Sequence, residues 1–209
     1  MLTVAETFVS IQGESTYAGL ACFFVRLAGC NLRCTYCDTR QALAAGHEES
    51  VDALVTAAVA ARTPLVEVTG GEPLLQDGFR ALATGLRDRT DATVLVETNG
   101  SRDLAVIPEG VIAVVDVKCP GSGEGGSFDP ANLARLRAYD EVKFVLTGRR
   151  DYEWARGFAA DHALFGRCRA VLFSPAADRL EAELLAGWML ADRSAARLQV
   201  QLHKMLRVP

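Results

Sequence analysis

The sequence lacks the features that mark several large protein classes. Its 209 residues carry a formal net charge of -4, and no run of basic residues is longer than Arg149-Arg150. Proteins that bind nucleic acid usually present a basic patch or stripe, so we expect no nucleic-acid partner. No apolar run approaches the roughly 20 residues that a membrane-spanning helix needs, so we expect no membrane partner. The first residues show no charged segment followed by an apolar one, so we expect no secretion signal and a cytoplasmic protein.

Cysteine is also scarce. Six cysteines in the whole chain are too few for a disulfide scaffold, which leaves clustered cysteines as candidate metal ligands. Cys22 and Cys168 lie within or beside apolar segments, and we expect both to be buried structural thiols. Cys119 lies beside Lys118, a candidate site residue, and its role stays open.

The other three cysteines, Cys30, Cys34 and Cys37, form a C-x3-C-x2-C motif. Iron–sulfur clusters are held by cysteine thiolates, usually four of them. Three thiolates with no obvious fourth would hold three irons of a cubane and leave the fourth iron open to a small molecule. We therefore expect a catalytic [4Fe-4S] cluster rather than one that only transfers electrons.

A structural zinc site is the alternative for these cysteines. Zinc prefers four ligands, commonly arranged as two separated pairs. The chain has no second C-x2-C, and its histidines, His47, His162 and His203, form no H-x3-H element. The pattern therefore favours the cluster over zinc.

Short apolar segments alternate with segments of helical spacing along the chain. We expect strands at 22–27, 65–69, 93–97, 112–117, 141–146, 170–173 and 198–203. We expect helices at 51–59, capped by Ser50, at 77–89, after Asp129 with Pro130 at the first position, at 152–162 and at 178–190. This alternation predicts parallel βαβ units in a single α/β domain over residues 1–209. Because there are fewer than the eight units of a closed barrel, we expect an open, partial (β/α)6 barrel that is TIM-like.

Polar residues follow several of the predicted strands, at 69–73, 97–100, 116–118 and 174–175, and Arg26 interrupts the first strand. In parallel α/β folds the carboxyl ends of the strands meet at one edge, where active sites gather. Adjacent glycines at 70–71 allow close backbone approach, and carboxylates suit an amine or ribose hydroxyls. We therefore expect these groups to converge on an adenosyl-sulfonium ligand.

Two further segments have a local pattern of interest. Residues 121–126 contain a formal G-x-G-x-x-G, but Cys119-Pro120 separate it from the preceding strand. A dinucleotide-binding loop joins a strand directly to a helix, so we expect a flexible loop that covers or contacts a ligand instead. At the other end, strict alternation over 198–203 predicts a strand that holds the terminal carboxylate of Pro209 in place.

Taken together, the residues resemble the 7-carboxy-7-deazaguanine synthases, a family of radical S-adenosylmethionine (SAM) enzymes in queuosine and other 7-deazapurine biosynthesis. The segments that carry the resemblance are Ser10-Ile11-Gln12-Gly13-Glu14-Ser15, 24–34, Tyr36-Cys37-Asp38-Thr39, 68–73, Glu97-Thr98-Asn99-Gly100, Asp116-Val117-Lys118 and Pro209. The resemblance implies a single radical SAM domain over residues 1–209 with an N-terminal substrate-binding extension. It also implies a homodimer.

The resemblance implies a reaction as well. A radical SAM lyase of this family takes a hydrogen atom from C6 of 6-carboxy-5,6,7,8-tetrahydropterin by means of a 5′-deoxyadenosyl radical. The substrate radical contracts its ring, recovers a hydrogen atom from the cofactor and loses ammonia, which gives 7-carboxy-7-deazaguanine. The cofactors implied are the [4Fe-4S] cluster, SAM and Mg2+, and the electron is expected from a reductant protein such as flavodoxin or ferredoxin.

By position, the resemblance assigns the site residues. Cys30, Cys34 and Cys37 would hold the cluster. The SAM-binding residues would be Tyr36, Asp38, Gly70, Gly71, Glu72, Glu97, Asn99, Lys118, Ser122 and Ser174. The substrate-binding residues would be Ile11, Gln12, Gly13, Glu14, Arg26, Thr69 and Pro209, with the Arg26 guanidinium suited to the C6 carboxylate. Thr39 would ligate magnesium beside that carboxylate.

Two other functions remain open from the residues. A protein that activates glycyl-radical enzymes shares the cysteine motif but acts on a protein partner, and would need a docking groove. A zinc-bound interaction module is the alternative that is not an enzyme.

Overall fold

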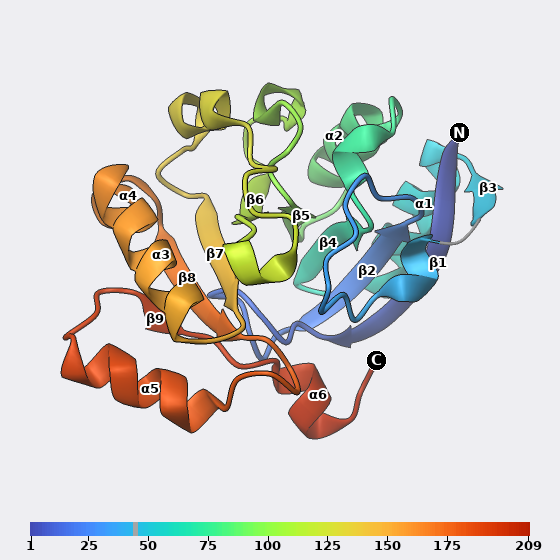
Figure 1. Ribbon diagram of the computed structural model, residues 1–209. Helices are drawn as coiled ribbons and strands as arrows, with labels where there is room; N and C mark the ends of the chain where they lie inside the picture. The colour runs from blue at the N-terminus through green and yellow to red at the C-terminus, as the bar shows by residue number, and fades with distance from the viewer. Residues whose placement is uncertain (44–45) are drawn as a thin grey trace.

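The computed structural model describes residues 1–43 and 46–209 of the chain. These residues form one nine-stranded sheet in the order β3-β1-β2-β4-β5-β6-β7-β8-β9. β1 (Leu2–Ile11) runs antiparallel to both of its neighbours, β2 (Ala21–Leu27) and β3 (His47–Glu49). From β2 onward in this order, each strand runs parallel to the next. The sheet curves but does not close, as Figure 1 shows. The predicted open, partial barrel is confirmed.

Six of the seven predicted strands are present. They are β2, β4 (Leu65–Gly70), β5 (Thr93–Thr98), β6 (Ile112–Asp116), β7 (Glu141–Leu146) and β8 (Ala170–Pro175). β1 and β3 were not expected from the sequence. They extend the sheet at its N-terminal edge and place the segment after Ile11 beside the open side of the barrel.

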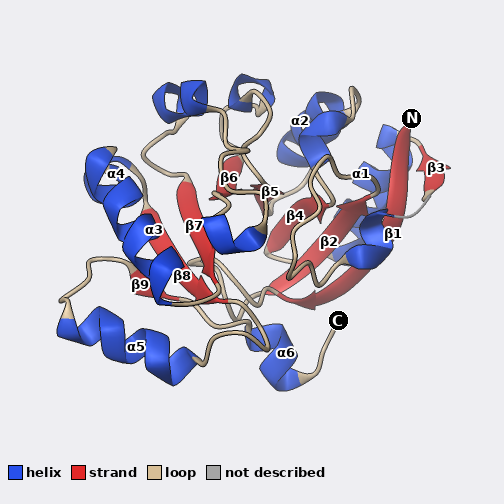
Figure 2. Ribbon diagram, in the orientation of Figure 1, coloured by secondary structure: helices blue, strands red, loops and turns tan. Residues whose placement is uncertain are grey.

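Helices cover the outer face of the sheet (Figure 2). They are α1 (Val51–Ala61), α2 (Phe79–Arg89), α3 (Arg149–Asp161), α4 (Leu164–Arg167) and α5 (Ala182–Ala191). A sixth, α6 (Leu202–Leu206), lies at the open side of the sheet instead. Ser50 caps α1 as predicted, because its side chain accepts a hydrogen bond from the backbone N–H of Ala53 at 3.1 Å. Within the part of the chain that the structure describes, no helix is long and apolar enough to cross a membrane.

Short 3-10 helices complete the connections. They are η1 (Arg40–Leu43), η2 (Pro73–Leu75), η3 (Leu104–Val106), η4 (Pro120–Ser122) and η5 (Pro130–Arg135). The segment after Asp129 is therefore helical, with Asp129 as its cap, but as a 3-10 helix rather than an α-helix. α5 begins at Ala182 rather than near residue 178, since Asp178 has a left-handed φ of 61° that a helix cannot contain.

The predicted strand at 198–203 is wrong. Only Arg197–Leu198 pair with β8, as β9, and the chain then leaves the sheet and forms α6. The side chains of Gln199 and Gln201 each donate a hydrogen bond to Glu14 at 2.9 Å, and the N–H of Leu202 donates to the carbonyl of Gly13 at 2.9 Å. These bonds replace strand pairing and hold the C-terminal segment against the N-terminal one.

The two faces of the sheet differ in chemistry. One face is apolar and packs under the helices, with Val25, Val68, Val96, Val115 and Phe144 among its fully buried residues. Because successive side chains of a strand point to opposite faces, the residues between these lie on the inner face. The inner face is polar toward the carboxyl ends of the strands, and it forms the wall of the pocket described next.

Candidate active site

A cavity of about 570 Å³ opens at the carboxyl ends of the strands. Its volume lies in the range of roughly 300–1,000 Å³ that is usual for small-molecule sites. All but two of the residues predicted for the site line it. They are Ile11, Gln12, Gly13, Glu14, Arg26, Cys30, Cys34, Tyr36, Cys37, Asp38, Thr39, Thr69, Gly70, Gly71, Glu97, Asn99, Lys118, Ser174 and Pro209.

Sheet register explains why these residues converge. Arg26 on β2 lies beside Thr69 on β4, Asp116 on β6 lies beside Lys143 on β7, and Val145 lies beside Ser174 on β8. In neighbouring parallel strands, two residues that are paired in register have their side chains on the same face of the sheet. Polar residues that are far apart in the chain are thereby placed on one wall.

The cysteine loop forms one end of the cavity. Cys30, Cys34 and Cys37 are free thiols of intermediate exposure, and burial raises the pKa of Cys30 and of Cys34. Among the described residues, no three His, Cys, Asp or Glu side chains gather closely enough to hold one metal ion. A cubane places its irons at separate corners, so three half-buried cysteines around one cavity fit a cluster without converging on one point.

Two glycines allow the cysteine loop to lie against the end of β4. A Cβ atom at Gly71 would come within 2.0 Å of the backbone oxygen of Gly29, and one at Gly70 would come within 2.0 Å of that of Leu27. Gly70 also has a φ of +139°, which L side chains rarely adopt. Both positions therefore require glycine for close backbone packing.

The glycine-rich segment 121–126 packs on the same loop. The N–H of Thr35 donates to the carbonyl of Ser122 at 2.8 Å, and the N–H of Arg33 donates to the Glu124 carboxylate at 2.6 Å. The segment contains η4 and does not join a strand to a helix. It therefore supports the cysteine loop, as a contact loop rather than a dinucleotide-binding one.

The structure does not bring Ser122 or Glu72 to the cavity. The Ser122 hydroxyl is buried and donates to the carbonyl of Cys119 at 2.6 Å. The Glu72 carboxylate is fully buried and accepts hydrogen bonds from the Thr98 hydroxyl at 2.8 Å, the Asn99 N–H at 2.7 Å and the Leu74 N–H at 3.0 Å. Glu72 thus joins the end of β4 to the end of β5 from behind the wall.

We expect Glu72→Ala to lower the free energy of unfolding by about 3 kcal/mol, since it leaves buried donors at Thr98, Asn99 and Leu74 without an acceptor, each costing roughly 1–3 kcal/mol before relaxation. Urea denaturation measures the change. Glu183→Ala, on the exposed side of α5, is the matched control and should be neutral. A loss below about 1 kcal/mol for Glu72→Ala would contradict the bracing role assigned from these bonds.

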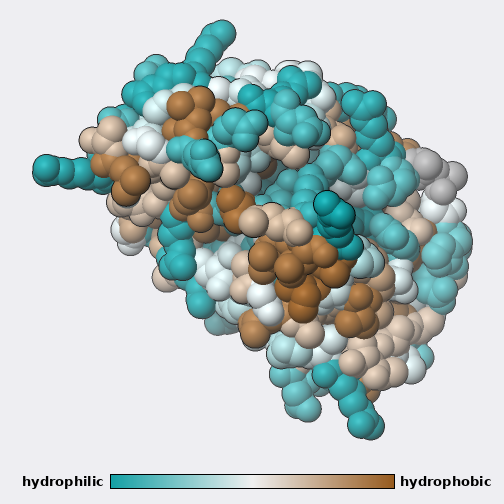
Figure 3. Space-filling model, turned by 90° about the horizontal axis from the view of Figure 1, so that it is seen from below, coloured by the Kyte–Doolittle hydropathy of each residue, from teal (hydrophilic) through white to brown (hydrophobic). Residues whose placement is uncertain are grey.

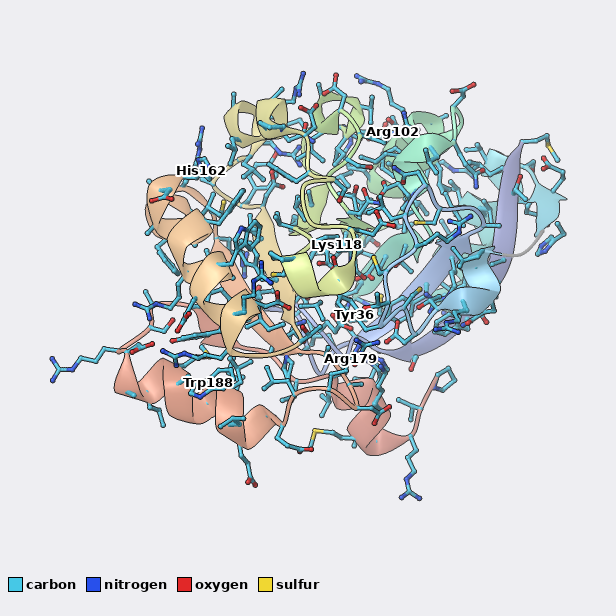
Figure 4. All side chains as sticks on the ribbon, in the orientation of Figure 1. Tyr36, Arg102, Lys118, His162, Arg179 and Trp188 are labelled. Atoms are coloured by element: carbon cyan, nitrogen blue, oxygen red, sulfur yellow. The ribbon has the colours of Figure 1, made fainter. Side chains whose placement is uncertain are left out.

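Two residues of the cavity wall carry buried polar atoms without partners. Among the described residues, the Tyr36 hydroxyl and Asp116 Oδ1 are buried and have no hydrogen-bond partner. The Lys118 ammonium lies 2.7 Å from Asp116 Oδ2 and 5.8 Å from the centre of the Tyr36 ring. Figure 4 shows Tyr36 and Lys118 near the middle of the molecule, with Arg102, His162 and Trp188 toward its periphery. Buried polar atoms are rarely left unpaired, so this part of the cavity suits a polar ligand.

Arg26 and the N-terminal segment form the opposite side. Arg26 Nε donates to Glu6 at 2.8 Å, and the guanidinium carbon lies 5.5 Å from the centre of the Phe8 ring. These contacts hold one edge of the guanidinium, and its terminal nitrogens have no hydrogen-bond partner among the described residues. A planar group held in this way can bind a carboxylate with two parallel hydrogen bonds.

The C-terminal segment closes the same side. The Ser10 hydroxyl donates to the Pro209 oxygen at 2.6 Å, and this bond, rather than the predicted strand, holds Pro209 in place. The Lys204 ammonium contacts Asp38 at 2.5 Å, and Gln201 donates to both Glu14 and Asp38. Although burial opposes it, the Lys204 contact holds the pKa of Asp38 below its ordinary value. α6 lies at the open side of the sheet in Figure 1.

Several residues of the cavity wall were not predicted from the sequence. Glu67, Lys143, Gln201, His203 and Lys204 all line it. Glu67 and Lys143 were detectable, because each is a charged residue with apolar neighbours on both sides in its strand. Charged residues are almost never fully buried unless they are paired, so such a residue in a central strand indicates a site.

The remaining cysteines lie outside the cavity. Cys22 and Cys119 are fully buried, and burial raises the pKa of each thiol. Cys168 is partly buried, packs against the core, and burial raises its pKa to about 11. These positions are those of packed thiols rather than reactive ones.

Known proteins are similar to this chain in sequence and in fold. A model of the Radical SAM superfamily matches residues 25–116. The 7-carboxy-7-deazaguanine synthase of Koribacter versatilis is 42% identical over 100% of this chain and 98% of its own length. The 7-carboxy-7-deazaguanine synthase of Chlorobaculum tepidum is also 42% identical, over 100% and 95%. The crystal structure of QueE from Escherichia coli has a TM-score of 0.75 and 23% identity, and covers 97% of this chain and 94% of that one.

These likenesses bear on the three functions that the residues left open. The relatives are synthases rather than activators of glycyl-radical enzymes or zinc modules, and they match over the full chain. Radical SAM enzymes use a [4Fe-4S] cluster and SAM, which the three cysteines and the cavity accommodate. The chain therefore belongs to the 7-carboxy-7-deazaguanine synthase family of radical SAM enzymes.

Proposed function

We propose that this cavity binds SAM and 6-carboxy-5,6,7,8-tetrahydropterin side by side and releases 7-carboxy-7-deazaguanine and ammonia. The observation that carries the proposal is the composition of one cavity: three cysteines at one end, and a guanidinium, carboxylates and a buried lysine at the other. Such a cavity suits a small polar substrate held within reach of the cofactor.

At the cysteine end, Cys30, Cys34 and Cys37 hold the [4Fe-4S] cluster in the proposal. When reduced, the cluster supplies the electron that cleaves SAM and so provides the radical that takes hydrogen from the substrate. Gly70 and Gly71 line the space for the methionine end of SAM, and because they have no side chains they leave that space open. Glu72 acts from behind the wall, by holding Asn99 in place.

The adenosine end of SAM is assigned to the neighbouring polar groups. The backbone of Tyr36 and Asp38 flanks it, and Asn99, Lys118 and Ser174 contact it from the strand ends. The polar lining at this end, which includes Asn99, Lys118 and Ser174, supports this assignment. The geometry gives Ser122 a supporting role only, through its backbone contact with Thr35.

At the other end, the proposal places the pterin between the N-terminal and C-terminal segments. Arg26 binds the C6 carboxylate with its free edge, and Thr39 ligates Mg2+ beside that carboxylate. Ile11, Gln12, Gly13, Glu14, Thr69 and Pro209 surround the ring. Glu97 was assigned to SAM from the sequence, but it contacts Lys143 and Thr69, and we now place it with the substrate residues.

Three further assignments rest on the family likeness. Residues 1–209 form a single radical SAM domain, with β1 and the segment after it as the N-terminal substrate-binding extension. The enzyme is a homodimer, and flavodoxin or ferredoxin supplies the electron. Exposed apolar side chains, which include Leu198, Val200, Met205 and Leu206, offer surface for a subunit contact. Figure 3 shows an apolar area on the underside of the molecule. Sedimentation of the reconstituted protein tests the subunit number.

The test of the function is an anaerobic assay with reconstituted protein, SAM, dithionite, Mg2+ and 6-carboxy-5,6,7,8-tetrahydropterin. We expect 7-carboxy-7-deazaguanine and ammonia in equal amounts, with more than one product molecule per SAM, since the family reuses SAM. Omission of the pterin is the control. SAM binding without any deazaguanine product would contradict the proposal, and zinc without iron or acid-labile sulfide would refute any radical function.

A further inference from the structure

Lys143 is a buried lysine at the centre of the cavity wall. It lies in β7 between Val142 and Phe144, and its side chain is only 4% exposed. Its ammonium contacts Glu14 at 2.8 Å, makes a closer contact with Glu97, and lies 3.6 Å from Asp116. One cation therefore joins the N-terminal extension to two strands of the barrel.

The charges around Lys143 do not balance. Carboxylates face it from the N-terminal extension and from β4, β5 and β6, and the Lys118 ammonium lies beside one of them. The titratable groups that face it are Glu14 after β1, Glu67 on β4, Glu97 on β5, Asp116 and Lys118 at the end of β6, and Tyr36 on the cysteine loop. Removal of the Lys143 ammonium would leave several of these carboxylates buried without a counter-charge.

The groups respond differently to this environment. Burial would lower the pKa of Lys143, but Glu14, Glu97 and Asp116 raise it well above its ordinary value, so the ammonium keeps its charge. Burial would raise the pKa of Glu14, but Lys143 outweighs burial and lowers it. Burial and the charges of Glu97 and Glu14 raise the pKa of Glu67 well above its usual range. Burial also raises the pKa of Glu97, and Lys143 opposes that rise.

The Gln12 side chain connects Glu14 to Glu67 by hydrogen bonds. The backbone N–H of Glu14 donates to Gln12 Oε1 at 2.9 Å, and Gln12 Nε2 donates to Glu67. Since a backbone N–H can only donate, the orientation of the Gln12 amide is determined. Glu14, Gln12 and Glu67 are therefore connected by hydrogen bonds. Among the described residues, Lys143 is the only cation that contacts this network directly.

We propose that Lys143 is a positioning residue for the substrate, whose ammonium holds Glu14 and Glu97 side by side as hydrogen-bond acceptors for the N–H groups of the pterin's aminopyrimidine ring. This inference rests on the proposed function. An ionised carboxylate only accepts hydrogen bonds, and the 2-amino group and ring nitrogens of a pterin offer several donors. Hydrogen bonds to a charged group are worth about 1.5–3 kcal/mol each, which gives roughly 10- to 100-fold in affinity.

The inference is tested with Lys143→Met and Lys143→Arg, reconstituted with cluster and saturated with SAM, without reductant so that no turnover occurs. Calorimetry measures two ligands: 6-carboxy-5,6,7,8-tetrahydropterin and the matching lumazine, in which an oxo group replaces the 2-amino group. We expect Lys143→Met to bind the pterin at least about 10-fold more weakly and to lose its preference over the lumazine, because the acceptors are no longer held. Lys143→Arg, which keeps the positive charge, should keep the preference.

The pH profile of pterin binding gives a readout that a purely structural role would not move. The carboxylates accept hydrogen bonds only when ionised, so binding is lost as the pH falls through their pKa. Without the ammonium this pKa rises, and Lys143→Met should lose binding at a pH about one unit or more above the wild-type value. The Lys143→Arg profile should match the wild type.

The outcomes separate this inference from the function on which it rests. If the wild type binds SAM but no pterin, the proposed function fails. If the wild type binds the pterin and Lys143→Met keeps both the preference and the pH profile, the inference alone is overturned. Should Lys143→Met fail to bind SAM, Glu14→Gln/Lys143→Met removes one carboxylate with the cation. In that variant we expect SAM binding and at least the same loss of pterin affinity, and wild-type pterin affinity would overturn the inference.

Discussion

Replacement of Cys30 by alanine is expected to abolish SAM cleavage. Cys30 lines the cavity with Cys34 and Cys37, and the three are the only cysteines among the described residues to do so. A cluster with one open iron already lacks a fourth thiolate, so loss of a third leaves two protein ligands. Without the Cys30 thiolate the protein is expected to lose the cluster, and without the cluster it cannot cleave SAM.

Iron content, acid-labile sulfide and 5′-deoxyadenosine formation after addition of dithionite measure this effect. Cys168→Ala is the matched control, because Cys168 packs against the core outside the cavity. It should keep full iron content and full cleavage. If Cys30→Ala still formed 5′-deoxyadenosine at the control's rate, the open-cluster interpretation would be refuted.

Deletion of Pro209 is expected to weaken pterin binding far more than SAM binding. The Pro209 oxygen accepts a hydrogen bond from the Ser10 hydroxyl at 2.6 Å, so Pro209 is held at the substrate side of the cavity. Deletion moves the terminal carboxylate back by one residue, about 3.5 Å of chain. Loss of two hydrogen bonds from the pterin to this carboxylate would cost roughly 100-fold in affinity.

Calorimetry with SAM and then with the pterin measures the two affinities separately. Pro209→Ala keeps a carboxylate at the same position and is the matched control, with a change of only a few-fold expected. SAM affinity should stay within a factor of about two in both variants. Equal losses for both ligands would instead assign the terminus to general order of the cavity rather than to the substrate.

The two ends of the cavity were not equally predictable. The cysteine end follows from short-range spacing, because Cys30, Cys34 and Cys37 lie on one loop whatever the rest of the chain does. The positions of Gly70, Glu97 and Lys118 followed from a general property of parallel sheets, which brings strand ends to one edge. For these residues a reliable list of strands was sufficient.

The substrate end depended on features that no local pattern contains. Gln199 is buried, while Leu198 and Val200 beside it are exposed at 41% and 36%. The alternation is therefore present over 198–201 with its polar side inward, toward Glu14, and the chain then forms α6 instead of continuing as a strand. A rule that buries apolar residues assigns the wrong face here, because the wall it meets is charged.

Glu67 and Lys143 show the same limit within the barrel. Each is flanked by apolar residues in its strand, so composition alone predicts a buried strand and is correct. Period-two alternation does not identify the inner face when both faces are buried, since the usual contrast between apolar and polar sides is absent. The charged residues themselves mark the inner face, at the positions where the ligand space begins.

The sequence by itself determined the cluster motif, the succession of parallel strands and the strand-end residues, because these depend on spacing between near neighbours and on the geometry common to all parallel sheets. Only the tertiary structure decided which charges meet. Lys143 contacts Glu14 from 129 residues away and Glu97 from 46 residues away. Sheet curvature and the return of the C-terminal segment bring these groups together, and both arise from packing over the whole chain rather than from any one segment.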